Sequence, residues 1–238
     1  MSTDVRRYLT SLTGTRVQLI RRPGAGRDNP SITLFHALLG PRGATVRRAQ
    51  LHSLEELGDF RTPEDLDRIG FEPWAEPLWF VCTNGRRDMC CAVKGRAVTS
   101  ALAREWPEGT WETTHLGGHR WAATLLALPS GLMLGRLTPD IAPGVCRLLD
   151  KGMVHLENLR GRAGLRQTVQ AAEAEVLARQ DATDPSWAEV YVESATPEQA
   201  TVRNGPERVT VTLHERPVAQ GPTSCRDLIE HGQATAPA

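Results

Sequence analysis

The sequence predicts an α/β protein in which helices pack on a mixed β-sheet. The apolar run from Leu78 to Cys82 has the length and composition of a buried strand. A helical pattern follows between Cys91 and Arg104, with its apolar residues on one side. The turn Pro129-Ser130-Gly131 then separates two further apolar runs, as in a β-hairpin. This order of strand, helix and hairpin is typical of a mixed sheet with helices on its faces.

Residues 1–75 predict a smaller α/β lobe. Residues 5–12 have helical spacing, and Ser53 and Thr62 are typical helix caps that precede acidic residues. The strands expected in this lobe are Arg16–Ile20, Ser31–Leu39 and Ala44–Arg48. Pro73 and Pro77 then indicate a connector, so we place a domain boundary after residue 75.

Residues 76–230 predict the larger domain, and residues 231–238 are expected to be a flexible tail. After the first helix we expect a second helix that begins at Thr138 and ends near Lys151, and an amphipathic helix over Leu165–Gln180. The further expected strands are Trp111–Thr114, Arg120–Leu128, Leu132–Leu137, Ala188–Ser194, Gln199–Arg203 and Arg208–His214. Asn204-Gly205 lies between the last two strands and is a strong hairpin signal.

Composition limits where the protein works and what it binds. Lys plus Arg equals Asp plus Glu, at 28 each, so the chain as a whole has no electrostatic reason to bind nucleic acid or an anionic membrane. Its longest apolar run, Trp121 to Leu128, is far shorter than the roughly 20 residues of a membrane helix. No secretory apolar segment follows the N-terminus. We therefore expect a cytoplasmic protein, in which thiols stay reduced and clustered cysteines more often bind metal than form disulfides.

Four metal-binding side chains lie close together in the sequence. Cys82 and Cys91 are separated by eight residues, and His115 and His119 by Leu116-Gly117-Gly118. The predicted helix begins at Cys91, and a helix N-terminus stabilises a thiolate, the form that binds metal. The two glycines argue against a helix between the histidines and let the backbone turn, so that both imidazoles can face one centre. Four such donors at one point would bind a metal ion or an iron–sulfur cluster.

The spacing distinguishes between two kinds of centre. Structural zinc sites usually have two to four residues between their cysteines, which makes the eight-residue loop long for zinc. A [2Fe–2S] cluster needs ligands on two irons, which a longer loop suits. Two cysteines and two histidines are also the donor set of a Rieske centre, although the Cys-x-His motifs of that class are absent. Zinc held by the same four ligands stays the alternative.

Two further alternatives concern the cysteines. Cys90 lies beside Cys91 and could replace it as a ligand; the spacing alone favours Cys91. A thioredoxin-type thiol oxidoreductase could use Cys82 with Cys90 or Cys91. Against that interpretation, the chain has no Cys-x-x-Cys motif, and the two histidines would have no role.

The cysteine and histidine motifs resemble the signature of the sucrase/ferredoxin-like family. They read Cys82-x8-Cys91 and His115-x-Gly-Gly-His119, and Leu128-Pro-Ser-Gly-Leu132 and Arg160-Gly-Arg162 fit as well. The resemblance spans roughly residues 15–180. Family members usually begin with a further strand and loop before the first helix, which this chain lacks. The completeness of the N-terminal lobe therefore stays open.

The resemblance implies both a fold and a function. It implies a thioredoxin-like ferredoxin domain, a mixed sheet with flanking helices, preceded by the smaller α/β lobe. It implies a [2Fe–2S] cluster bound by Cys82, Cys91, His115 and His119. The protein would then be an electron carrier rather than an enzyme, with redox proteins as partners, such as a flavoprotein reductase, and with no nucleic acid or membrane partner. The sequence does not give the oligomeric state.

Overall fold

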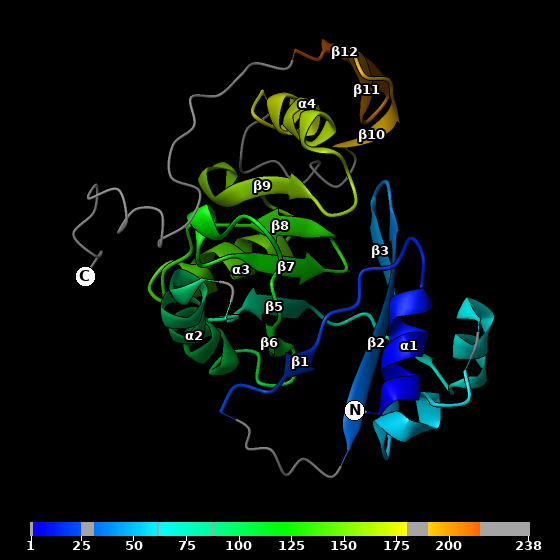
Figure 1. Cartoon of the computed structure of the whole chain (residues 1–238). Helices are drawn as coiled ribbons and strands as arrows, with labels where there is room; N and C mark the ends of the chain where they lie inside the picture. The colour runs from blue at the N-terminus through cyan, green and yellow to red at the C-terminus, as the bar shows by residue number, and fades with distance from the viewer. Residues whose placement is uncertain (1, 25–30, 61, 87, 180–189, 215–238) are drawn as a thin grey trace.

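The computed structural model describes residues 2–24, 31–60, 62–86, 88–179 and 190–214. At its centre is a six-stranded sheet of order β1-β6-β5-β7-β8-β9 (Figure 1). The strands, in that order, are Ile20–Arg21, Thr110–Thr113, Leu78–Cys82, Leu125–Leu128, Leu132–Leu134 and Leu159–Arg162. β5 runs parallel to β6 and antiparallel to β7, so the sheet is mixed, as predicted.

The connections in this sheet form a thioredoxin-like arrangement. The helix α2 (Met89–Ala103) joins the parallel strands β5 and β6, and α3 (Ala142–Asp150) follows the antiparallel pair β7–β8. Both helices flank the sheet, and they contact each other (Figure 1). The predicted α/β class, a mixed sheet with flanking helices, is confirmed.

Two smaller sheets flank the central one. They are β2–β3–β4 (Ile32–Gly40, Gly43–Leu51, Glu72–Pro73) and β10–β11–β12 (Val190–Ala195, Gln199–Asn204, Glu207–Thr212). The other helices are α1 (Thr3–Ser11), α4 (Gln167–Leu177) and short 3-10 helices over Leu54–Leu57, Pro63–Arg68, His119–Trp121 and Leu156–Asn158. α4 packs against both β9 and the β10–β11–β12 sheet, which ties the third sheet to the central one (Figure 1).

β5 is buried along its whole length. Trp79 and Val81 belong to the core that lies against the helices, whereas Leu78 and Phe80 pack with Trp111 and the β2–β3 hairpin. Both faces of the strand are therefore covered, which is why its sequence is a continuous apolar run rather than an alternating one. The end of this strand is held rigidly from both sides.

Several local predictions are wrong or incomplete. Of the expected strand Arg16–Ile20, only Ile20 is in a strand, β1, which pairs with β6 of the central sheet through Ile20 and Thr113. The expected strand Arg120–Leu128 is reduced to β7, because its first residues complete a 3-10 turn. β9 was not expected, because its sequence contains a glycine between two arginines rather than an apolar pattern. In the structure Gly161 adopts a φ of 110° within this strand.

The domain boundary at residue 75 stays a prediction. β1 comes from the predicted N-terminal lobe but joins the central sheet, so the two predicted parts share hydrogen bonds there. The predicted tail, residues 231–238, lies outside the described residues, as do Gln180 and the first two residues of the expected strand Ala188–Ser194. In the described part of the chain, no helix combines the length and the apolar character needed to cross a bilayer.

Candidate metal centre

Cys82 is positioned by the carboxyl end of β5. It is the last residue of the strand and is 0% exposed. Its N–H donates to the carbonyl of Thr124 at 3.0 Å, and the N–H of Thr83 donates to the carbonyl of Thr113 at 3.1 Å. The strand end is thus tied to the neighbouring chain segment on each side, so the Cys82 thiol has a fixed position.

Cys91 is positioned by the first turn of α2. Asp88 is the N-cap residue, and its carboxylate accepts the N–H of Cys90 at 2.9 Å. Cys91 follows as the third residue of the helix and is 1% exposed. The N–H of Cys91 itself donates to the carbonyl of Asp88 at 3.2 Å, which closes this first turn and fixes the position of Cys91.

A glycine in α2 brings the two cysteines together. A methyl group at Gly95 would collide with the carbonyl oxygen of Cys82. Glycine therefore lets the helix approach the end of β5 more closely than any larger residue would allow. The distance between Cys82 and Cys91 depends on this contact.

His115 is held by the N-terminal segment of the chain. The guanidinium of Arg16 donates from Nη2 to the His115 carbonyl at 2.6 Å. Beside it, the N–H of Thr114 donates to the carbonyl of Leu19 at 3.0 Å, and the N–H of Leu19 donates to the Thr114 hydroxyl at 3.1 Å. These bonds extend the β1–β6 pairing by one residue and fix the backbone that carries the half-buried imidazole.

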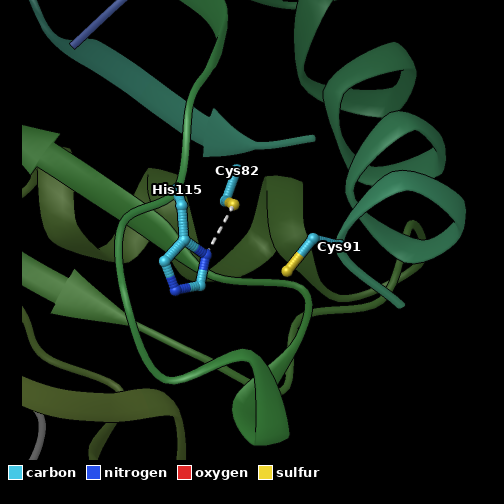
Figure 2. Close-up of side chains that lie close together, drawn as sticks. All are labelled: Cys82, Cys91 and His115. Carbon is cyan, nitrogen blue, oxygen red and sulfur yellow. Dashed lines mark hydrogen bonds between the residues drawn. The ribbon is translucent and has the colours of Figure 1, made fainter. Parts of the chain in front are cut away.

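The three side chains converge on one point. Figure 2 shows Cys82, Cys91 and His115 directed toward one another from a strand end, a helix start and a loop. Cys82 Sγ and His115 Nδ1 are 4.0 Å apart, and the ligand atoms of all three residues lie within 4.8 Å of one another. Both thiols are free. Two buried sulfurs and an imidazole in this geometry could hold zinc or iron.

The two thiols have opposite acidities without a metal. The pKa of Cys82 is lowered to about 5, chiefly because the Cys91 thiol donates a hydrogen bond to its sulfur, and also because the N–H groups of Asn84 and Leu116 and the His115 ring face it. The pKa of Cys91 is raised, because its proton is held by Cys82 and the thiol is buried. The pair thus shares one proton, and a metal that needs both thiolates would release it.

The remaining predicted ligands lie at the edge of this group. Gly117 and Gly118 have φ values of 98° and 63°, so the chain between the histidines turns and is not helical, as predicted. His119 begins a 3-10 helix, but its side chain lies outside what the structure describes, and its role as fourth ligand stays a prediction. Cys90 is half-buried at the second position of α2 and is disulfide-bonded, so Cys91 is the cysteine of α2 that joins Cys82.

The sequence did not assign a role to two residues near the site. Arg160 of β9 packs against Gly118 so closely that a methyl group there would collide with its guanidinium, and its Nη1 donates to the Gly117 carbonyl at 3.4 Å. Buried Glu112 of β6 accepts the hydroxyl of Thr83, next to Cys82, at 3.1 Å and is paired with Arg21. Only the Arg160-Gly-Arg162 motif could have indicated the first of them.

The comparison with protein-family models agrees with the motif. The model of the sucrase/ferredoxin-like family matches residues 8–161. A solved thioredoxin-like [2Fe–2S] ferredoxin from Aquifex aeolicus is similar at 18% sequence identity, with a TM-score of 0.33, over 39% of this chain and 100% of that one. At that TM-score the likeness identifies no ligand of this chain. No curated protein matches the chain.

Proposed function

The chain belongs to the sucrase/ferredoxin-like family, and on that premise we propose that it is an electron carrier with a [2Fe–2S] cluster held by Cys82, Cys91, His115 and His119. The observation that supports this most is the convergence of three donors, from three separate elements, to within 4.8 Å. When bound, such a cluster accepts and releases one electron at a time.

The surroundings of the donors suit this role. Cys82 and Cys91 are buried, so they keep water from the cluster. The N–H groups of Asn84 and Leu116 face the Cys82 sulfur. Hydrogen bonds to ligating sulfurs, like the nearby positive charge of Arg160, favour added negative charge and therefore raise the reduction potential.

Zinc bound by the same residues is the second candidate. The ligand atoms of Cys82, Cys91 and His115 are close enough for one tetrahedral ion after a small adjustment, and zinc accepts this donor set. A thioredoxin-type oxidoreductase is the third candidate, favoured by the shared proton of the two cysteines. Burial argues against it, because a thiol that exchanges with a protein disulfide must be reached by its substrate.

The ligand set can be tested with one spectroscopic experiment. The protein is purified without oxygen, reduced, and its paramagnetic signal is probed for nitrogen nuclei coupled to the iron. The proposal expects strong couplings from two imidazole nitrogens. His115→Cys should remove one of them and keep the visible colour, because a thiolate can replace an imidazole at iron. His52→Gln, at an exposed histidine remote in sequence from the site, is the matched control and should change nothing.

A diamagnetic, colourless protein that contains zinc would overturn the proposal in favour of the second candidate. A coloured protein without nitrogen couplings would show that the cluster has other ligands. If both nitrogen couplings survive unchanged in His115→Cys, His115 is not a ligand of the cluster, and the rest of the proposal stands.

A further inference from the structure

We infer that the surface around the candidate metal centre is the docking site for an acidic redox protein. The inference rests on the proposed function, because it assumes that electrons leave the molecule here. We call this the docking surface, and it consists of Met89, Val93, Lys94, Arg120, Arg136 and Arg160.

The first observation is a group of arginines on the histidine side of the centre. Arg136 and Arg120 both lie over the ring of Trp121, with their guanidinium carbons 3.9 and 5.6 Å from its centroid. Arg160 donates a hydrogen bond to the Gly117 carbonyl in the same loop. In the part of the chain that the structure describes, none of these three arginines forms an ion pair with a carboxylate.

The positive charge of these arginines is therefore left for a partner to neutralise. Stacking on Trp121 holds Arg120 and Arg136 in place without neutralising them. The pKa of Arg160 is lowered by burial and by the charge of Arg120, which indicates that the two positive groups act on each other. A carboxylate brought close to them would relieve this repulsion.

The second observation is the distribution of acidic residues. Residues 89–104 and 113–139, which contribute the helix and the loop of the site, contain no Asp or Glu at all. The whole chain has a formal net charge of +0, so this basic region is balanced by acidic residues elsewhere. Two buried carboxylates border the region, and both are already used: Asp88 caps α2, and Glu112 is paired with Arg21.

The third observation is exposed apolar surface on the cysteine side. Met89 and Val93 lie one turn apart on α2, on either side of Cys91 in the sequence, and are 72% and 66% exposed. Lys94 is exposed beside them. Protein–protein interfaces usually combine exposed apolar side chains with charged ones, and electron-transfer complexes are among the smallest of these.

These features favour a protein over other anionic partners. A net charge of +0 gives the molecule no general attraction to nucleic acid or to an anionic bilayer. The side chains of Arg120, Arg136 and Arg160 instead lie beside the histidine loop of the site, where a second redox centre must come close for an electron to pass. Complementary charge around two such centres orients the encounter and speeds it.

The test uses small electron acceptors of opposite charge. The loaded protein is reduced, freed of reductant, and mixed rapidly with hexacyanoferrate(III), an anion, or hexaamminecobalt(III), a cation. Each acceptor takes one electron from the reduced centre. We expect the rate with the anion to fall as the salt is raised to about 0.15 M and the rate with the cation to rise, because exposed charges are then screened.

The variant is the double substitution Arg120→Gln and Arg136→Gln, with Arg6→Gln and Arg104→Gln as the matched control. The control residues are exposed arginines outside the docking surface, without an ion pair in the described part of the chain, and their replacement removes the same charge. At low salt the first variant should oxidise about threefold more slowly with the anion and faster with the cation. The control should match the original protein.

A second readout needs no turnover. Binding of flavodoxin, an acidic one-electron carrier, to the oxidised protein is measured by titration calorimetry at low salt, beside vesicles of phosphatidylglycerol. We expect flavodoxin to bind and Arg120→Gln with Arg136→Gln to weaken that binding by about threefold or more. The same salt dependence with both acceptors, equal behaviour of variant and control, or binding to vesicles but not to flavodoxin would each overturn the inference. If the protein holds no redox-active centre, the proposed function itself is wrong, and this outcome is seen before any acceptor is added.

Discussion

Cys146 and the pair Cys82 and Cys91 are all buried free thiols, but their surroundings differ. Cys146 is in the middle of α3, is 0% exposed and packs among the apolar side chains of the main core. Burial raises the pKa of its thiol. Cys82 lies at a strand end and Cys91 at a helix start, where N–H groups and an imidazole face the sulfur of Cys82.

The difference indicates which surroundings would suit a buried cysteine to bind metal. Burial alone favours the neutral thiol, which acts as a small apolar side chain, as at Cys146. The centre needs in addition polar groups that stabilise a thiolate and a second and third donor at the same point. At Cys82 those groups are the N–H groups of Asn84 and Leu116, in the loops that follow β5 and β6, together with the His115 ring.

The largest expected effect concerns the ligands. Cys91→Ser should abolish the visible absorption and the bound metal completely, whereas Cys146→Ser should retain both. The reason is that serine is a poor ligand for iron, and that Cys146 lies outside the donor group. Absorption spectra and metal content of the two purified variants measure this. Retention of colour in Cys91→Ser would contradict the assignment.

The next effect concerns the close approach of α2 to β5. Gly95→Ala should lower the free energy of unfolding of the metal-free protein by about 2 kcal/mol, because the methyl group meets the Cys82 carbonyl. It should also reduce metal content by displacing Cys91. Gly144→Ala in α3 is the matched control, since a methyl group there meets nothing within 4 Å, and it should stabilise by about 0.5–1 kcal/mol. Urea unfolding measures the free energy of unfolding of both variants. Equal changes in the two variants would show that Gly95 has no special role.

A smaller effect separates packing from metal binding. Cys146→Ala should cost about 1 kcal/mol of unfolding free energy through the lost sulfur contacts. Because Cys146 has no polar partner in the site, the spectrum and metal content should not change. A loss of metal in this variant would link the core to the centre and would weaken the contrast between the two kinds of cysteine.

The smallest effect concerns the N-terminal segment. Arg16→Ala removes the exposed bond to the His115 carbonyl, worth about 0.5 kcal/mol, so that His115 should be held less firmly. Release of iron to a chelator should become about twofold faster, since 1.4 kcal/mol corresponds to tenfold. Arg6→Ala, at an exposed arginine of α1, should leave the release rate unchanged.

Local patterns predict the elements around the cysteines well. β5 is a continuous apolar run because both its faces are covered, and α2 begins near the predicted position because Asp88 caps it. The hairpin predicted at Asn204-Gly205 is confirmed. Gly205 adopts a φ of 55° in the turn, a conformation that glycine permits. Each of these features depends on neighbours in the sequence.

Other features depend on residues that are distant in the sequence. The bond from Arg16 to His115 spans 99 residues, and no local pattern indicates it. Arg162 of β9 forms a buried ion pair with Glu173 of α4, so charged residues stand where a strand pattern would have apolar ones. The convergence of Cys82, Cys91 and His115 was predictable from the motif, whereas the roles of Gly95 and Arg160 appear only when β5, α2 and β9 are placed together.

The central claim is that these donors hold two irons rather than one zinc. Iron, acid-labile sulfide and zinc are measured per chain in protein purified without oxygen. The account predicts a red-brown protein with iron and sulfide in equal amounts, two of each per chain, and little zinc. A colourless protein with one zinc per chain and no sulfide would contradict it.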